Sequence, residues 1–343
     1  MQDLLFDNPP FHFDSPVHFG LALGDEYMLS DNGHLVEVAN LFSGTGVAGH
    51  AGGGGGGSPA ATLVGSANGL EFDLIWDSSV TSAKNWKDIE SSVIQAAELF
   101  TGVFTNHAVL NIEVGFGEVG GRALEAGALG ESDSLGYLVP NTGADAGLVG
   151  AVLGAADAGL VAAGQMATGA ANALDGVANN FFITAAEAKA LGLVDPTAGL
   201  DGAIGFSNTA LIAFGHTAGG HHYDAVAIAA HELSEVMGRV GFGGATLIDQ
   251  AGDVFSKVYT PLDIFRYAQP GVPDLTSAAG FFSLDFGVTD LLPFNDGGNG
   301  GDAADWGTSP LTKGDAFDAF AATGKAAVSS VDMLALEALG YQR

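Results

Sequence analysis

Apolar and polar residues alternate along GLEFDLIWDSSV, residues 69 to 80, and this period of two predicts a β-strand. In DIESSVIQAAELFTGVF, residues 88 to 104, apolar residues recur at helical spacing, with Asp88 placed to cap the helix. Alternation returns in AVLNIEVGFGEV, residues 108 to 119. Strand, helix and strand in this order indicate an α/β unit, whose crossover connection favours a parallel pair.

The remaining pattern extends this unit into an α/β (α+β) body with a mixed, mostly parallel twisted sheet. Residues 144 to 192 are rich in alanine and are expected to be helical. DGAIGFSN, residues 201 to 208, has the pattern of a short edge-like strand. A helix follows Asp224, and a loop-rich region then leads to VSSVDMLALEALGY, residues 328 to 341, which predicts a terminal helix.

Four segments are expected along the chain. Residues 1 to 42 form an N-terminal extension, and residues 43 to 60 form a glycine-rich linker. Residues 61 to 241 form an N-terminal subdomain that carries the helix after Asp224. Residues 242 to 343 form a loop-rich C-terminal subdomain.

Composition narrows the classes of function. The chain carries 40 acidic residues but only 10 Lys and Arg, so its net charge of −30 points away from nucleic acid and anionic membranes. It has no cysteine, which excludes disulfides, thiolate metal sites and cysteine nucleophiles. The apolar residues 147 to 174 contain Asp157 and many small residues, which favours packed helices over a membrane span.

The start of the chain, MQDLLFDNPPFHFD, carries acids where a secretory signal would carry basic residues. An acidic, cysteine-free chain fits an exported protein or one that binds divalent cations. We therefore expect an extracellular or cell-surface protein that is exported without a recognisable N-terminal signal.

The candidate chemistry lies in HHYDAVAIAAHELSEVMG, residues 221 to 238. His231 and Glu235 are four residues apart, so on a helix their side chains project from one face. Glu232 is placed to reach a water held by a metal at His231, where a carboxylate can accept a proton. The alternatives are a buried His231 hydrogen-bonded to a nearby carboxylate, or a solvated helix face that carries Glu232 and Glu235. His221 and His222 are expected at the rim of the cleft.

YDAVAIAAHELSEVMGRVG, residues 223 to 241, resembles the active-site helix of metzincin zinc peptidases, the clan of serralysins and matrixins, whose pattern is HExxHxxGxxH. The resemblance implies that His231 is the first metal ligand and Glu232 the general base, and that Gly238 is the turn glycine. Glu235 stands in place of the second histidine and Gly241 in place of the third.

The resemblance extends weakly to LDIFRY, residues 262 to 267, where Phe265 occupies the position of the clan's methionine. Tyr267 would then approach the metal and stabilise an oxyanion. No histidine follows His231, so the remaining ligand must come from elsewhere. Asp263 is the preferred candidate, and the alternatives are Tyr267, Asp249, His221 and His222. Zinc is the expected metal, and the carboxylates also make manganese or calcium competitive.

A second cation site is expected in FNDGGNGGDAADWG, residues 294 to 307. Four hard oxygen donors lie on this glycine loop and could surround calcium: Asp296, Asn299, Asp302 and Asp305. The alternative is a polar turn whose side chains satisfy their own backbone.

Two functions follow from these features. The first is an exported metal-dependent endopeptidase that cleaves a peptide or protein substrate lying along residues 201 to 208. The second is a catalytically impaired metzincin-like scaffold that self-assembles into a surface, filament or adhesive protein. GHLVEVANLF, residues 33 to 42, would then donate a strand to a neighbouring subunit and make a homo-polymer through residues 1 to 60. The same extension could instead pack on its own body, or cover the cleft as a propeptide with His12, His18 or His34 blocking the metal.

Overall fold

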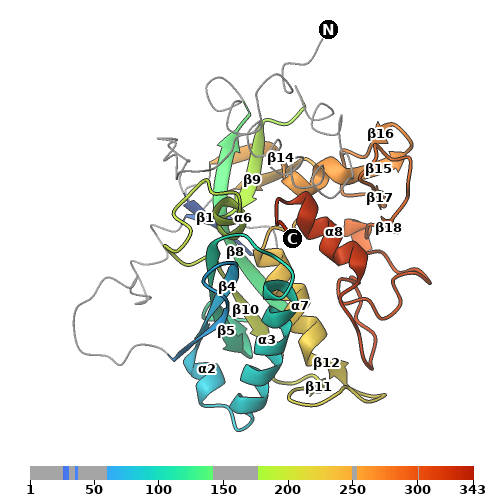
Figure 1. The fold of residues 1–343 in the computed structure, drawn as a ribbon. Coiled ribbons are helices and arrows are strands. Elements are labelled where there is room, and N and C mark those ends of the chain that lie inside the picture. Colours follow the sequence, from blue (N-terminus) through green and yellow to red (C-terminus); the bar gives the residue numbers. More distant parts are fainter. Residues whose placement is uncertain (1–25, 31–34, 38–59, 142–176, 249–252, 300) are drawn as a thin grey trace.

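The computed structural model describes residues 26–30, 35–37, 60–141, 177–248, 253–299 and 301–343 (Figure 1). The chain forms a mixed α/β fold around a ten-stranded sheet, as the sequence predicts. Along the sheet the order is β13 (Ala245–Ile248), β14 (Val254–Tyr259), β9 (Asn180–Thr184), β8 (Gly130–Pro140), β10 (Gly202–Phe206), β5 (Ala108–Phe116), β4 (Leu70–Trp76) and β3 (Ala61–Gly65). The pairs β4/β5, β5/β10 and β9/β14 are parallel, and the other pairs on this path are antiparallel.

The predicted strand–helix–strand unit is present. It consists of β4, α3 (Trp86–Thr101) and β5, and the two strands are parallel, with Leu74 opposite Ile112. The buried residues alternate along β4 and β5, as the pattern of period two requires. The terminal helix is α8 (Ser330–Ala338). Both the type and the order of these elements were readable from the sequence.

Two predictions about elements need correction. Most of residues 144 to 192 lies outside the described residues, and the part that is described contains the strand β9 before the short helix α6 (Ala185–Ala190). β10 is a strand as predicted, but it lies between β8 and β5 in the interior of the sheet. All five of its residues are buried. Ile204 and Phe206 belong to the hydrophobic core, and the small residues Gly202, Ala203 and Gly205 allow other elements to pack closely on the strand.

Strands from outside the predicted N-terminal subdomain, residues 61 to 241, join its sheet from both sides of the sequence. β13 and β14 follow residue 241, yet they join the same sheet through β9. At the N-terminal end, β1 (Glu26–Ser30) pairs with β2 (Leu35–Glu37) and with β8 of the same chain. His12, His18, His34 and residues 43–59 lie outside the described residues.

Helices α3 and α7 (Ala225–Val236) lie side by side and pack on the sheet, α3 mainly on β3 and β4, α7 on β8 and β10 (Figure 1). The core between them and the sheet includes Phe72, Leu74, Val93, Phe100 and Leu233, all fully buried. The other helical segments are α2 (Ser78–Thr81) and the 3-10 turns η2 (Pro261–Phe265) and η3 (Gly297–Asn299). Within the described part of the chain, no helix is long and apolar enough to cross a membrane.

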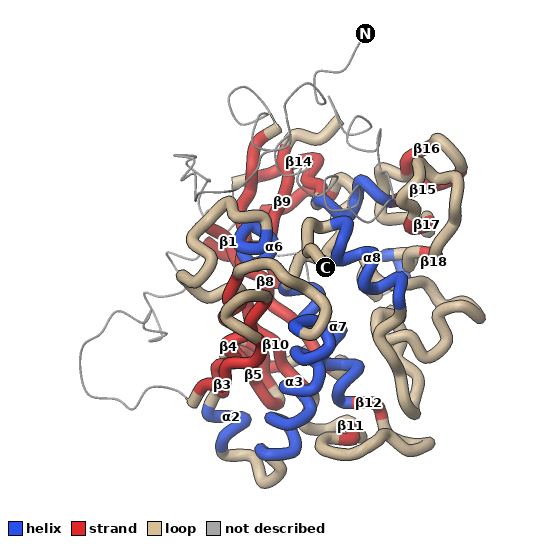
Figure 2. Tube along the Cα trace, in the orientation of Figure 1, coloured by secondary structure: helices blue, strands red, loops and turns tan. Residues whose placement is uncertain are grey.

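Smaller pairings complete the fold: β6 (Glu118–Val119) with β7 (Arg122–Ala123), β11 (Ile212–Ala213) with β12 (Tyr223–Asp224), and a sheet of β15 (Arg266–Gln269), β16 (Val272–Pro273), β17 (Phe281–Phe282) and β18 (Leu292–Pro293). After β18 the chain runs mostly as loops until α8 (Figure 2). This loop region packs against α7, since it carries Ala316 and Asp305, which contact the helix.

Candidate metal centre and cleft

Helix α7 begins and ends where the sequence predicts. Asp224 is the N-cap, and its Oδ1 accepts hydrogen bonds from the backbone N–H groups of Val226 and Ala227 at 3.1 and 3.4 Å. Its Oδ2 accepts from the Ala326 N–H, which ties the start of the helix to the C-terminal loop region. At the other end Gly238 has φ +117°, a left-handed conformation that glycine adopts without steric cost.

The turn at Gly238 directs Arg239 back toward the helix. Arg239 is fully buried, and its Nε donates to Ser234 Oγ at 2.7 Å. Its Nη2 lies 3.2 Å from Glu235 Oε1, and its Nη1 lies 2.5 Å from Asp305 Oδ1. The guanidinium therefore holds two carboxylates that come from different parts of the chain.

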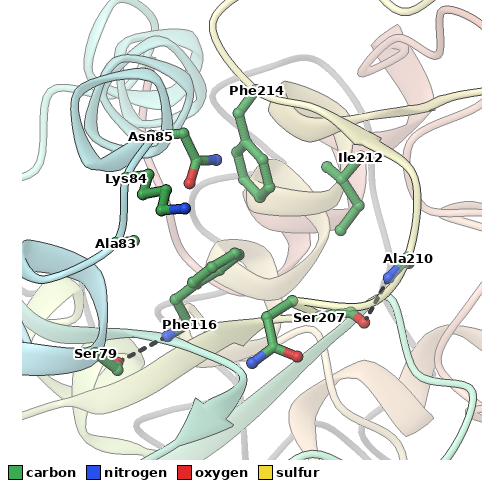
Figure 3. A pocket seen from close by; sticks show the side chains of 10 residues that line it. Ser79, Ala83, Lys84, Asn85, Phe116, Ser207, Ala210, Ile212 and Phe214 are labelled. Atoms are coloured by element: carbon green, nitrogen blue, oxygen red, sulfur yellow. Dashed lines mark hydrogen bonds between the residues drawn. The ribbon is translucent and has the colours of Figure 1, made fainter.

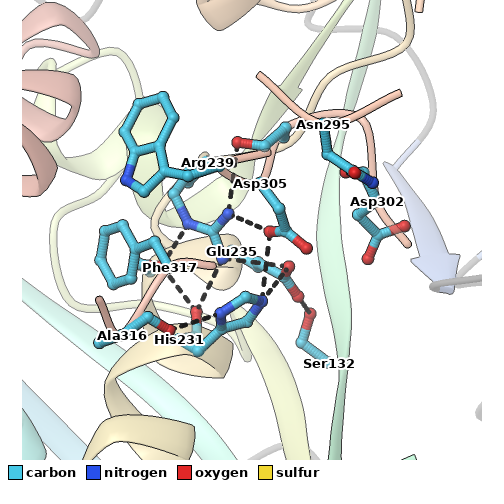
Figure 4. Close-up of polar contacts among 12 residues, drawn as sticks. Ser132, His231, Glu235, Arg239, Asn295, Asp302, Asp305, Ala316 and Phe317 are labelled. Atoms are coloured by element: carbon cyan, nitrogen blue, oxygen red, sulfur yellow. Dashed lines mark hydrogen bonds and ion pairs between the residues drawn. The ribbon is translucent and has the colours of Figure 1, made fainter. Parts of the chain in front are cut away.

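His231, Glu235 and Asp305 form one group (Figure 4). His231 Nε2 lies 3.2 Å from Glu235 Oε1 and 3.2 Å from Asp305 Oδ1. One donor atom from each of the three residues lies within 4.8 Å of the others, and no other such cluster occurs among the described residues. The helical spacing thus brings His231 and Glu235 together as predicted, and Asp305 completes the group.

Hydrogen bonds fix the donor atoms of this group. His231 Nδ1 lies 2.9 Å from the carbonyl oxygen of Ala316, so Nδ1 carries the N–H, because a carbonyl can only accept. Nε2 is thereby turned toward Glu235 and Asp305. Ser132 Oγ on β8 donates to Glu235 Oε2 at 2.7 Å, which leaves Oε1 facing His231. A histidine held through its other nitrogen is typical of metal ligands.

Asp305 is positioned by its neighbour Trp306. The indole of Trp306 is fully buried, contacts the rings of Phe282 and Phe294, and donates its Nε1–H to Asp332 Oδ1 at 2.6 Å. Asp332 lies in the first turn of α8, in a capping box with Ser329. A buried aromatic anchor and the start of α8 therefore place Asp305 against α7.

The charged side chains of the group shift one another's pKa values. Burial lowers the pKa of His231, but the charge of Asp305 and the hydrogen bonds to Asp305 and Glu235 together outweigh burial, and the pKa lies well above its ordinary value. Burial raises the pKa of Asp305, but the positive charges of His231 and Arg239 outweigh it, and the pKa is lowered. Without a metal ion, an imidazolium and a guanidinium thus balance the charges of Glu235 and Asp305.

Glu232 lies beside this group and lines the same cleft. Its side chain is 6% exposed, and burial followed by the charge of Glu235 raises its pKa well above the ordinary value. A Cβ atom at Gly130 would lie 2.5 Å from Glu232 Oε1 and 2.8 Å from Ile228 Cγ2, so a side chain at the start of β8 would displace Glu232 from this position. Glu232 is therefore packed tightly between α7 and β8 with its carboxyl at the cleft.

The cleft has a volume of about 560 Å³ and runs over α7. One wall is residues 125–131, which lead into β8, and the other is formed by residues 315–322 of the C-terminal loop region. His231, Glu232, Glu235 and Asp305 all contribute to its lining. A neighbouring hollow of about 420 Å³ shares Glu235, Gly301 and Asp302 with it and continues toward Phe242 and Leu247.

A separate hollow of about 540 Å³ lies near the start of α3 (Figure 3). Lys84 is the only titratable residue in its lining, which otherwise includes Asn85, Phe116, Ser207 and Phe214. It offers neither a carboxylate nor an imidazole for acid–base chemistry or metal binding. The cleft over α7 is therefore the candidate site.

Asp263, the expected third ligand, has a different role. Its Oδ2 accepts from the backbone N–H groups of Thr260 and Phe242, and its Oδ1 accepts from that of Gly243. It caps η2 and does not belong to the His231 group. The structure brings Asp305 to the group instead. Asp249, another alternative, lies outside the described residues.

Tyr267 lies in the apolar interior of the C-terminal sheet. It is fully buried, its ring contacts Phe281 and Phe286, and its hydroxyl has no hydrogen-bond partner among the described residues. Burial followed by the charge of Asp285 raises its pKa to about 12. Phe265 is also buried in this region, and neither residue lines the cleft.

His221 and His222 lie in the loop before α7. His221 is exposed, and the His222 ring contacts that of His216 at a centroid distance of 6.4 Å. The carbonyl of His222 accepts from the Gly324 N–H, next to Tyr223, which lines the cleft. The two histidines are thus near one end of the cleft, but they are not in its lining.

The four expected calcium donors have different surroundings in the described structure. Asp296 Oδ1 accepts from the Gly298 N–H, and Asn299 exchanges hydrogen bonds with Asn295. Asp302 is exposed at the junction of the two hollows, and Asp305 belongs to the His231 group. Asp296 and Asn299 therefore fit the alternative of a polar turn whose side chains accept hydrogen bonds from nearby backbone N–H groups.

Sequence reasoning missed Arg239 as a member of the site and assigned Asp305 to calcium. The available signal for the first was an arginine directly after the turn glycine Gly238 and four residues after Glu235, although the pair forms through the turn because the helix ends before Arg239. For Asp305 the signal was weaker, consisting of an acid next to tryptophan in a polar loop. Comparison of the chain with protein families, with curated proteins and with solved structures finds no match.

Proposed function

We propose that the protein is an exported metal-dependent endopeptidase, with His231, Glu235 and Asp305 as metal ligands and Glu232 as general base. The observation that carries this proposal is the meeting of three donor atoms within 4.8 Å on the floor of a cleft that Glu232 also lines. One imidazole and two carboxylates form a mixed nitrogen and oxygen shell that suits zinc, and manganese is the alternative. The sequence resemblance to metzincins supports the same reaction class.

The donor set fits a divalent cation in its chemistry. His231 presents Nε2 because Nδ1 is engaged with Ala316, and Glu235 presents Oε1 because Ser132 holds Oε2. A bound cation supplies a Lewis acid that polarises a peptide carbonyl and acidifies water, and its charge favours the ionised form of Glu232.

The protein side chains then perform the proton transfers. Glu232 accepts a proton from the attacking water and returns it to the leaving amine, which is the work of a single general base and acid. Burial between α7 and Gly130 restricts the positions that its carboxyl can adopt at the cleft. Arg239 holds Glu235 and Asp305 from the protein side, so that their orientation does not depend on the cation.

The peptide would lie along the start of β8. Because β10 is in the interior of the sheet, the substrate role that the sequence suggested for residues 201 to 208 passes to residues 127 to 131, which line the cleft. Extended peptides commonly bind by adding to such a backbone segment.

One observation favours the catalytically impaired scaffold. Arg239 already contacts both carboxylates, so the group is neutral without a cation when His231 is protonated. In that case the four residues form a structural ion-pair network. The arm that would donate a strand to a neighbour contributes β1 and β2 to the sheet of its own chain, so this pairing does not favour a polymer.

Elemental analysis decides between the two functions. The purified protein should contain about one equivalent of zinc or manganese, and the His231→Ala variant should contain none. A metal-free wild-type protein that also fails to take up zinc in equilibrium dialysis would overturn the peptidase proposal.

A further inference from the structure

Apart from His231, the ionisable side chains that line the cleft over α7 are acidic, Tyr223 excepted. Besides Glu232, Glu235 and Asp305, it contains six carboxylates and no lysine or arginine: Glu125, Glu131, Asp224, Asp302, Asp315 and Asp318. A cleft lined by one sign of charge concentrates ligands of the opposite sign.

Of all the carboxylates in the lining, including Glu232, Glu235 and Asp305, four already have partners. Glu235 and Asp305 are held by Arg239, Glu131 pairs with Arg122, and Asp224 caps α7. The other five have no ion pair with a lysine or arginine of the described chain. A divalent cation at His231 and Arg239 together would offset Glu235, Asp305 and part of this excess, so the cleft stays negative with its metal bound.

Two of the unpaired carboxylates indicate a missing ligand. Glu232 is 6% exposed and lines the cleft, and its carboxyl group has no hydrogen-bond partner among the described residues. Asp318 Oδ1 on the opposite wall is buried and has no hydrogen-bond partner among the described residues. Buried polar atoms are normally hydrogen-bonded, so an unpartnered carboxylate oxygen at a cleft marks a place for a donor.

Apolar side chains lie next to Asp318. Ala319, Phe320, Ala321 and Ala322 continue the same wall, and Phe320 is 49% exposed. Lysine and arginine side chains place their carbon stems on apolar surface while the charged end meets a carboxylate, and arginine also stacks on aromatic rings.

We infer that the cleft over α7 selects a positively charged peptide, with a lysine or arginine side chain seated against Asp315 and Asp318. This inference rests on the proposed function and adds its substrate class. A net charge of −30 attracts any cationic peptide, so the test must separate the cleft from the rest of the surface.

Binding can be measured without cleavage in full-length Glu232→Gln protein loaded with zinc. The probes are two fluorescent peptides that differ only in carrying lysine or glutamate at two central positions, followed by anisotropy in 0.15 M salt. The lysine peptide should bind at least about tenfold more tightly. Adding Asp315→Asn and Asp318→Asn should reduce this preference roughly five- to tenfold. The matched control adds Glu98→Gln and Asp290→Asn, two exposed acids away from the cleft, and should retain the preference.

Equal binding of the two peptides, or an equal loss of preference in the cleft and control variants, would overturn the inference. Cleavage by the wild-type protein is then measured with the same peptides. Equal cleavage of both rejects the substrate class and leaves the peptidase proposal intact. Selective binding of the lysine peptide without cleavage rejects the peptidase proposal and leaves the charge preference intact.

Discussion

Asp305 Oδ1 lies 3.2 Å from His231 Nε2, although the two residues come from a C-terminal loop and a helix in the middle of the chain. This contact makes Asp305, and not Asp263, the third member of the candidate metal site. Substituting the two aspartates separates a ligand from a structural residue. The Asp305→Asn variant should lose bound metal at least tenfold, as expected when a ligand's charge is removed. Metal content by mass spectrometry after dialysis provides the measurement.

Asp263→Asn is the control for that experiment. It weakens the acceptor of three backbone N–H groups and should lower the free energy of unfolding by about 1–2 kcal/mol. Metal content should stay at the wild-type level. Loss of metal in Asp263→Asn with retention in Asp305→Asn would reverse the assignment.

The Glu232→Gln variant should keep its fold and its metal but lose cleavage by a factor of about 10²–10⁴. Glutamine has nearly the shape of glutamate, so the tight fit against Gly130 is preserved while the ability to accept a proton is lost. Cleavage of a quenched fluorescent peptide mixture gives the rate, and circular dichroism checks the fold. Cleavage at the wild-type rate would exclude Glu232 as the general base.

The Arg239→Gln variant should be destabilised by about 3–5 kcal/mol, because a buried guanidinium is removed and two buried carboxylates lose their partner. Urea unfolding with and without added zinc tests this. Zinc should recover part of the lost stability, since a cation between Glu235 and Asp305 replaces the missing positive charge. An equally stable variant would show that the ion pairs make no net contribution.

The Tyr267→Phe variant should leave cleavage unchanged. The hydroxyl has no hydrogen-bond partner in the described structure and lies outside the cleft, so its removal also relieves the desolvation of a buried polar group. We expect the free energy of unfolding to stay the same or to rise by about 1 kcal/mol. A large fall in the cleavage rate would restore Tyr267 to an oxyanion role.

Glu187 provides a pH-dependent prediction away from the site. It is 1% exposed, neither carboxylate oxygen has a hydrogen-bond partner, and burial raises its pKa well above the ordinary value of 4.5. Above pH 4.5 the folded protein therefore keeps a proton that the unfolded chain releases, so this group lowers stability as the pH rises.

The Glu187→Gln variant removes that dependence. The variant and the wild type should have nearly the same free energy of unfolding at pH 4. Above pH 4.5 the variant should become more stable than the wild type by about 1.4 kcal/mol for each pH unit, as long as Glu187 stays protonated in the folded wild type. Urea unfolding at pH 5 and pH 7 measures the difference, with the exposed Glu98→Gln as a control. A difference that does not change with pH would mean that Glu187 titrates normally.

Local patterns predicted much of the fold. The alternation in β4 and β5, the helical spacing in α3 and the caps of α7 are short-range signals, and each led to the correct element. Alanine composition failed at residues 180–184, where NFFIT forms β9, because sheet pairing and burial of its aromatic residues decide the conformation. The same limit applies to β10, whose interior place depends on pairing with both β8 and β5.

The site divides in the same way. His231, Glu232 and Glu235 lie within two turns of one helix, so spacing alone predicted that His231 and Glu235 would meet. Asp263 and Asp305 are both acids that follow that helix in the sequence, and spacing does not distinguish them. The difference arises from tertiary packing. Asp305 is positioned by the buried side chain of its neighbour Trp306, whereas Asp263 is positioned by its hydrogen bonds to the backbone around η2.

The hydrogen bond from Trp306 to Asp332 sets an order of events for a newly made chain. A ribosome-bound fragment that stops before residue 330 contains every proposed ligand, but it lacks the helical turn against which the indole is fixed. Such a fragment would lack the contact between Trp306 and α8 that helps to place Asp305 beside His231. Under the proposed peptidase function, the fragment would therefore stay inactive until the final helix docks, which would protect the producing cell during synthesis.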